Sequence, residues 1–304
     1  MSDTVLSWLL EDENPAVRYR ALTEICEAGE TEEAKAAYDA IWRRQEIVRL
    51  LRKQDADGLW DTKDYGVHTS LRYLTALAEY GLKRDERIDR FAEYSIAFLR
   101  GKEGAAANQD YSGCANALVL RALVMLGYHD RAEVRELIDR YAASQLYDGG
   151  FICKRLLDKR PERKSCYKAA LAALLLYAEC KRKDILPANA NELVGYFLKR
   201  DVFYSSDRSQ SFGEGRPGWR FVDNFFPVEP MRIGLPQIVA ALSILGAGDE
   251  PAVREAWRLL RGKADEAGRL KLEGTLTKQP LGFGKVGAVN KWVTFYAALA
   301  EKYS

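Results

Sequence analysis

The sequence predicts an all-α protein, and three observations support that prediction. Apolar segments of helical length alternate along the chain with amphipathic segments, in which apolar residues recur every three or four positions. No segment shows the sustained apolar–polar alternation of a half-buried strand. The turns between segments repeat the same glycine-centred patterns, which is typical of a protein built from repeated helical units.

The apolar segments are expected to be buried helices, because a helix that is apolar on most sides must be covered on most sides. They are 69–80, 114–126, 166–180 and 236–245. An amphipathic segment follows each of them, and we expect these segments to be helices with one face in water: 86–100, 131–145, 188–199 and 251–263. The repeating unit is therefore a helical hairpin, in which a buried helix leads through a tight turn into an amphipathic one.

The turns inside the hairpins share one pattern. LGYHDRAEVR (126–135) and LGAGDEPAVR (245–254) both have Leu-Gly, an aspartate three residues after the glycine, and then Val-Arg. YGLKRDERI (80–88) is a looser copy. We expect each glycine to end its helix in the left-handed conformation and each aspartate to cap the next helix.

A second pattern, Gln-x3-Gly-x-aromatic, follows the amphipathic segments. It occurs as Gln54, Gly58 and Trp60 and again as Gln145, Gly149 and Phe151, with a degraded copy, ADEAGRL, at 264–270. We interpret it as a helix-ending glutamine, a glycine turn, and an aromatic side chain that fills the gap between neighbouring hairpins.

These turns resemble the QW repeats of squalene/hopene cyclases and of protein prenyltransferase β-subunits. Over nearly its whole length the chain is similar to small bacterial prenyltransferase and squalene oxidase repeat proteins. The segments that carry the likeness are 8–22, 54–60, 112–128 and 290–299. The resemblance implies an α/α toroid, with inner helices around a central cavity and outer helices wrapped outside. From the repeats we expect about five or six hairpins in one domain, 1–304, with 1–30 as an N-terminal helical extension packed on the ring.

Composition limits the partners and the compartment. The chain has 46 Lys+Arg and 44 Asp+Glu, a net charge of +2, which argues against a nucleic-acid partner. Its apolar runs are too short to span a bilayer, and its first residues do not form a signal peptide. Five scattered cysteines without a CxxC pair indicate reduced thiols. We therefore expect a cytoplasmic protein without a membrane span, and the oligomeric state stays open.

The catalytic motifs of the similar families are missing. Neither the DxDD acid motif nor the DDxxD metal motif of terpene cyclases occurs. The stretch 149–171 resembles the zinc region of the prenyltransferases, and Cys166 and Tyr167 match its Cys-Tyr step. However, Lys164 stands where that family has an aspartate, and no histidine follows near Asn290. We expect no metal and no cofactor.

Candidate catalytic residues cluster at expected helix starts. Lys164 lies beside Cys166, where an ammonium and a helix N-terminus both favour a thiolate, so Cys166 is a candidate nucleophile. A small core cysteine is the alternative interpretation. His68 and Asp110, also near starts of inner helices, are candidates for proton transfer.

The candidate ligand-binding residues combine charge, hydroxyl groups and aromatic rings at the same expected rim. The residues expected at this rim are Tyr111, Tyr167, Lys168, Glu229, Arg232, Asn290 and Lys291. Trp219 and Phe226 belong to the irregular, aromatic-rich stretch 212–227 and either line the cavity or cap the core. Several helix starts at one rim favour an anion. We therefore expect an apolar, isoprenoid- or lipid-like molecule with a carboxylate or phosphate end in the central cavity. Two functions stay open: a metal-independent enzyme, or a non-catalytic binding or interaction module that kept the fold and lost the catalytic motifs.

Overall fold

The computed structural model describes residues 2–60, 67–101, 113–152, 164–204, 221–230, 232–276 and 279–304, with the backbone alone for 67–70. Its helices are α1 (Asp3–Leu9), α2 (Pro15–Arg20), the π-helix η1 (Ala21–Ile25), α3 (Glu32–Trp42), α4 (Gln45–Leu51), α5 (Val67–Glu79), α6 (Glu86–Leu99), α7 (Cys114–Leu126), the 3₁₀-helix η3 (Tyr128–Asp130), α8 (Ala132–Ala142), α10 (Tyr167–Lys181), α11 (Ala190–Leu198), α12 (Leu235–Ile244), α13 (Pro251–Arg261) and α14 (Lys291–Lys302). These ranges contain isolated β-bridges but no strand, so the all-α prediction is confirmed.

The alternation of buried and half-exposed helices is also confirmed. The apolar segments form α5, α7, α10 and α12, and the amphipathic segments form α6, α8, α11 and α13. In α10 nearly every side chain from Tyr167 to Cys180 is buried, whereas α13 buries only Val253, Ala256 and Leu260. The difference follows from the sequence pattern, because α13 carries apolar residues along one stripe only.

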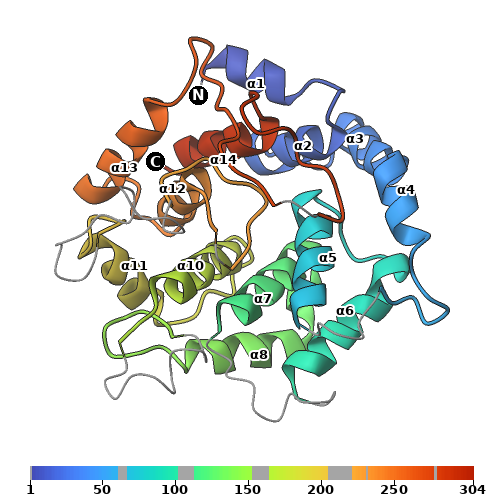
Figure 1. Ribbon diagram of the computed structural model, residues 1–304, viewed down its shortest axis with the longest axis horizontal. Coiled ribbons are helices and arrows are strands. Elements are labelled where there is room, and N and C mark those ends of the chain that lie inside the picture. The colour runs from blue at the N-terminus through green and yellow to red at the C-terminus, as the bar shows by residue number, and fades with distance from the viewer. Residues whose placement is uncertain are drawn as a thin grey trace.

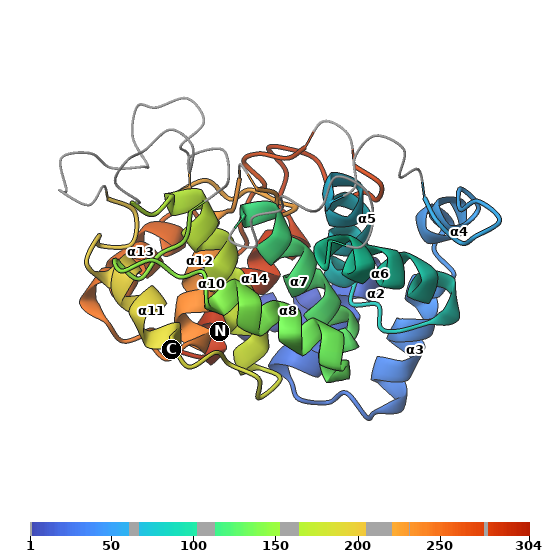
Figure 2. The ribbon, with the colours of Figure 1, turned by 90° about the horizontal axis from the view of Figure 1, so that it is seen from below.

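The buried helices form a continuous series in space. α5 packs against α7, α7 against α10, α10 against α12, and α12 against α14. Figure 1 shows this series in the middle of the molecule, with α6, α8, α11 and α13 on its outside. Figure 2 shows α5, α7 and α10 side by side, edge-on to the first view. At the other end of the series, α14 contacts α1 and α2, so the first and last helices of the chain are neighbours.

The Gln-x3-Gly-x-aromatic turns have one common backbone. Gly58, Gly149 and Gly268 adopt φ values of 75°, 85° and 81°, which explains the glycine in each copy. Each of them donates its N–H to the carbonyl three residues earlier. Two residues after each glycine lies a buried side chain: Trp60, Phe151 or Leu270. The degraded copy at 264–270 is therefore a true repeat of the other two.

The glutamine of this motif joins two elements. Gln54 Nε2 donates to the carbonyl oxygens of Gly58 at 2.9 Å and Arg87 at 2.6 Å, so it ties its own turn to the first turn of α6. Gln145 Nε2 does the same with the carbonyl oxygens of Gly149 at 2.8 Å and Asn189, the N-cap of α11, at 3.3 Å. Each glutamine thus links a turn to the start of the next outer helix.

The third copy has Ala264 in place of the glutamine. Here the neighbouring helix is α1, which approaches so closely that a Cβ on Gly268 would lie 2.9 Å from Val5 Cγ2. α1 therefore packs beside this turn as α6 and α11 pack beside the first two turns.

The turns inside the hairpins confirm the glycine prediction and correct the aspartate one. Gly81, Gly127 and Gly246 all have positive φ, at 81°, 97° and 88°. In all three turns the N-cap is the fourth residue after the glycine. Asp85 occupies that position and its side chain accepts the Arg87 N–H. Asp130 and Asp249 come one residue too early, so the expectation that they cap α8 and α13 is wrong.

We expect the buried aromatic residues of the repeated turns to be major contributors to stability. Trp60 stacks on Tyr73 with ring centroids 5.0 Å apart, and Phe151 stacks on Tyr141 at 4.8 Å. Trp60→Ala and Phe151→Ala should each lower the free energy of unfolding by about 3–5 kcal/mol in urea titrations, because each leaves a cavity. Tyr147→Ala is the control, since Tyr147 lies in the Phe151 turn but is 82% exposed. A cost for Trp60→Ala no larger than that of the control would contradict this role.

Candidate functional site

Four of the candidate site residues lie wholly or partly outside what the structure describes. Asp110, Tyr111 and Trp219 fall outside the described ranges. His68 lies in the first turn of α5, where the backbone alone is described. Their assigned roles stay predictions.

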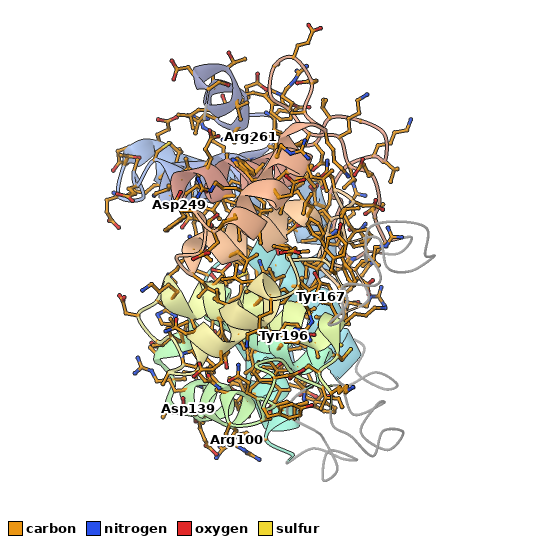
Figure 3. All side chains as sticks on the ribbon, turned by 90° about the vertical axis from the view of Figure 1, so that its left-hand side faces the viewer. Arg100, Asp139, Tyr167, Tyr196, Asp249 and Arg261 are labelled. Atoms are coloured by element: carbon orange, nitrogen blue, oxygen red, sulfur yellow. The ribbon has the colours of Figure 1, made fainter. Side chains whose placement is uncertain are left out.

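The candidates at the start of α10 lie next to one another in different environments. Cys166 is the half-buried N-cap of α10, and its backbone N–H donates to the Phe151 carbonyl oxygen at 2.7 Å. Lys164 is exposed and Lys168 is half-buried. Tyr167 is buried in the interior (Figure 3), and its hydroxyl donates to the Val202 carbonyl oxygen at 2.6 Å. Burial raises the pKa of Tyr167 well above its ordinary value, so this hydroxyl remains a protonated structural donor.

The candidates before α12 lie in an irregular segment. Glu229 and Arg232 pair through their backbones, with each N–H donating to the other's carbonyl at 3.0 Å. The Arg232 guanidinium lies over the Phe225 ring, 5.1 Å from its centroid, and 3.7 Å from the Asp223 carboxylate. Phe226 is fully buried.

The two candidates at the start of α14 already have protein partners. Asn290 is buried: its Oδ1 accepts the N–H groups of Trp292 and Val293, and its Nδ2 donates to the Phe283 carbonyl oxygen at 2.7 Å. Lys291 is 7% exposed, and its ammonium donates to the Glu11 carboxylate at 2.8 Å. Asn290 thus caps the helix, and Lys291 joins α14 to the segment after α1.

Aromatic side chains fill the space between α5, α14 and the loops that meet them. Phe226, Phe283 and Trp292 form a mutually packed cluster with centroid distances of 5.0–5.4 Å, and Tyr80 and Tyr296 pack on its edges. Beside them, the described residues leave a cavity of about 40 Å³ that reaches Thr75 and Glu229. The described side chains therefore leave little free space in this part of the interior, and a ligand in a central cavity stays a prediction.

A closed set of charged groups lies at the other end of the buried helices, and we call it the charge network. Its members are Arg20, Glu24, Glu79, Arg121, Glu179, Arg182 and Tyr296, from α2, η1, α5, α7, α10 and α14. Glu79 is fully buried and accepts from Arg20 at 2.8 Å, Arg121 at 2.7 Å and the Tyr296 hydroxyl at 2.6 Å. Arg182 closes the circuit by pairing with Glu24 and Glu179, each at 2.9 Å.

The network holds its groups charged despite their burial. Burial by itself raises the pKa of Glu79, but Arg121 and Arg20 more than offset this and leave the pKa below its ordinary value. Burial acts the same way on Glu24, where Arg182 and Arg20 hold the pKa well below its ordinary value. Three arginines thus balance three glutamates, as buried charges require.

Sequence reasoning missed this network, although it left a signal. Arg121 is the single charged residue of the apolar helix α7, and Glu79 and Glu179 lie near the C-terminal ends of the apolar helices α5 and α10, where a buried charge must find a partner. The partners come from chain positions as far apart as Arg20 and Tyr296, so the pairing itself is not visible in the sequence.

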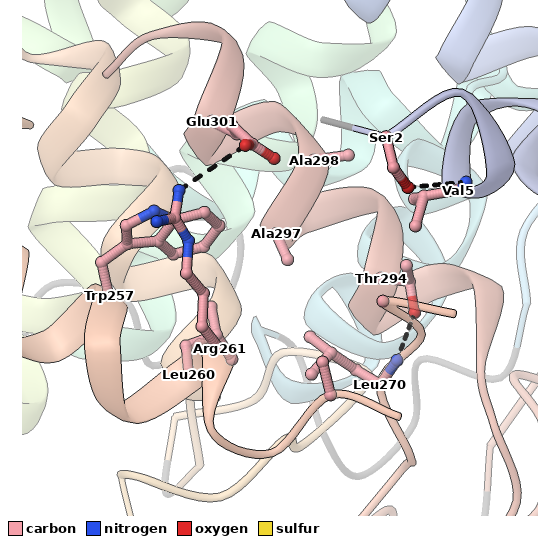
Figure 4. A pocket seen from close by; sticks show the side chains of 12 residues that line it. Ser2, Val5, Trp257, Leu260, Arg261, Leu270, Thr294, Ala297, Ala298 and Glu301 are labelled. Carbon is pink, nitrogen blue, oxygen red and sulfur yellow. Dashed lines mark hydrogen bonds and ion pairs between the residues drawn. The ribbon is translucent and has the colours of Figure 1, made fainter. Parts of the chain in front are cut away.

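A second kind of site lies where the two ends of the chain meet. A pocket of about 230 Å³ opens between α1, α13 and α14 (Figure 4), and we call it the seam pocket. Its walls include the apolar side chains of Val5, Leu260, Leu270, Ala297 and Ala298. Trp257 and Arg261 form its outer side, with the guanidinium 4.8 Å from the indole centroid and 3.5 Å from the Glu301 carboxylate.

Ala264 also lines the seam pocket. In the other two turns the equivalent residue is the glutamine that bridges to the next outer helix. The shorter alanine leaves that bridging space open, so the pocket exists where the repeat has lost its linking side chain.

Within the described ranges, no three His, Cys, Asp or Glu side chains gather as ligands for a metal ion. In the same part of the chain, no helix is both long and apolar enough to cross a membrane. In comparisons with known proteins, no family model matches the chain, and no curated protein matches its sequence.

Removal of one arginine should show that the charge network is structural. Arg20→Met should lower the free energy of unfolding by about 3–5 kcal/mol, because the buried carboxylates of Glu79 and Glu24 each lose one of their charged partners. Arg258→Met is the control, since Arg258 pairs with Glu255 on the exposed face of α13, and it should leave the free energy of unfolding nearly unchanged. Equal costs in urea unfolding would contradict the structural role.

Proposed function

We propose that the chain is an α/α toroid closed by its own first helix. Support comes from the continuous series from α5 to α14, the outer helices beside it, and the contact of α14 with α1 and α2. The third repeated turn adds to this, because α1 approaches it as α6 and α11 approach the first two. On this proposal α1 is the outer partner of α14 rather than an appendage to a finished ring.

The function proposed for this toroid is the binding of a small apolar molecule with an anionic end, in the seam pocket rather than at the centre. The observation that carries the proposal is the pocket itself: about 230 Å³, apolar on its inner walls, with the Arg261 guanidinium at its outer side. Ligand sites typically combine apolar walls with a few placed polar groups in this way.

The ion pair at the outer side of the pocket can exchange partners. Arg261 is largely exposed, and its 3.5 Å pair with Glu301 is a surface ion pair, which contributes about 1 kcal/mol or less. A ligand carboxylate can therefore replace Glu301 at little cost, while the ligand's apolar part leaves water for the walls formed by Leu260, Leu270 and Ala297.

The packed interior supports a binding protein more than an enzyme like the terpene cyclases or prenyltransferases that the sequence resembles. The charge network and the aromatic cluster occupy the region between the buried helices, and their polar groups are bound to each other. The metal-independent enzyme stays as the second hypothesis, and it rests on Cys166 at the start of the fifteen-residue helix α10.

Octanoate and octanol are suitable probes, because they share an apolar chain and differ in charge. We expect octanoate to bind saturably in calorimetric titrations. Ala264→Gln should weaken binding of both probes about tenfold or more, because the longer side chain fills the pocket. Arg261→Met should weaken octanoate binding about fivefold and leave octanol binding unchanged, since one partly exposed charge contact is lost.

The matched control is Ala143→Gln, which places the same side chain on an exposed alanine near the end of α8. It should bind both probes as the parent does. The proposed function is wrong if Ala264→Gln binds octanoate as tightly as this control.

A further inference from the structure

A second pocket lies at the ends of three buried helices and has no role in the proposed function. Its volume is about 170 Å³, and it lies where α5, α7 and α10 end against η1. Its polar lining includes Glu24, Glu179 and Arg182 of the charge network, together with Lys83 and Lys183. We call it the lysine pocket.

The two lysines give this pocket an excess of positive charge. The three arginines and three glutamates of the network balance one another, so Lys83 and Lys183 add two positive charges that no carboxylate of the described residues pairs with. Among the described residues, neither ammonium forms an ion pair. Lys83 Nζ donates one hydrogen bond, to the Met125 carbonyl oxygen at 3.0 Å, and keeps two N–H groups for other acceptors.

The lowered pKa of Lys83 is consistent with an ammonium group that has no carboxylate partner of its own among the described residues. Burial is the largest influence and lowers the pKa of Lys83 to about 8. Of the surrounding groups, the Glu24 and Glu179 carboxylates act to raise this pKa, and Lys183 and Arg20 act to lower it. Both carboxylates are paired with arginines, and they offset only part of the cost of burying the ammonium.

The helix ends around the pocket do not account for both lysines. Carbonyl groups at a helix C-terminus attract cations when they lack donors. Here the Leu77 carbonyl accepts the Leu82 N–H, and the Cys180 carbonyl accepts the Ile185 N–H. Among the described residues, Met125 alone has a carbonyl that accepts a hydrogen bond from Lys83 or Lys183, so most of the hydrogen-bonding capacity of these two ammonium groups remains unused.

We propose that the lysine pocket binds a small oxyanion with two negative charges, a phosphate group or a short dicarboxylate, held between Lys83 and Lys183. Two negative charges on the ligand match the two positive charges that Lys83 and Lys183 add to the neutral network. Ammonium groups suit such ligands, because each offers several donors and charge-assisted hydrogen bonds to oxyanions are strong. The site does not depend on the seam pocket.

Isothermal titration with inorganic phosphate and with malonate, at pH 7 and constant ionic strength, tests this proposal. The parent should bind at least one of the two saturably, and the tighter one identifies the class of oxyanion. Lys83→Met and Lys183→Met should each weaken that binding about tenfold or more. Lys181→Met is the matched control, because Lys181 is exposed on the last turn of α10 and does not line the pocket, and it should bind as the parent does.

Two results overturn the proposal: no saturable binding of either anion, or binding by Lys183→Met as tight as that by Lys181→Met. The pKa of Lys83 provides a second readout, measurable by NMR after reductive methylation of the lysines. A bound anion should raise this pKa in the parent and in Lys181→Met but not in Lys183→Met. A Lys83 pKa that the tighter anion leaves unchanged in the parent also contradicts the site.

Discussion

The buried pairing of Glu79 with Arg20, Arg121 and Tyr296 is the constraint on which the arrangement of the helices depends. The four side chains come from α5, α2, α7 and α14, so one carboxylate fixes four helices relative to one another. A carboxylate without its partners is costly in an apolar interior. Each helix must therefore pack with the rotation and axial position that bring these side chains together. Glu179 and Arg182 impose the same requirement on the placement of α10. Apolar packing stabilises the helices, and the charge network selects one way of assembling them.

The repeated turns act at the periphery, where the network does not reach. Gln54 and Gln145 each tie a turn to the start of the next outer helix. The third turn has Ala264 in place of the glutamine. No glutamine therefore joins this turn to α1, and a pocket remains between α1, α13 and α14. The proposed ligand site is thus a consequence of the missing glutamine in the last repeated turn.

The sequence predicted the helices and their turns well, because those features depend on local rules. Gly58, Gly149 and even Gly268 of the degraded copy are required by positive φ, and a pattern of glycines reports that directly. The aspartate prediction was wrong because Asp130 and Asp249 lie one residue before the cap position, a register that only the length of the turn sets. The candidate site was harder to predict. Asn290 and Tyr167 are conspicuous polar residues in the sequence, yet the fold uses their polar groups for capping and packing. The sequence pattern does not predict the pockets beside Lys83 and Ala264, because the residues that line them come from segments distant in the chain.

The most direct test of the account is a double-mutant cycle on the free energy of unfolding, with Glu79→Gln and Arg121→Met made singly and together. If the charge network fixes the helices, each single change leaves a buried partner unmatched, and the double change relieves part of that cost. The account predicts a coupling of about 2 kcal/mol or more, with the double variant less destabilised than the sum of the two single variants. Additivity within about 0.5 kcal/mol would show that the two groups do not depend on each other, and would contradict the claim that the network holds the fold together.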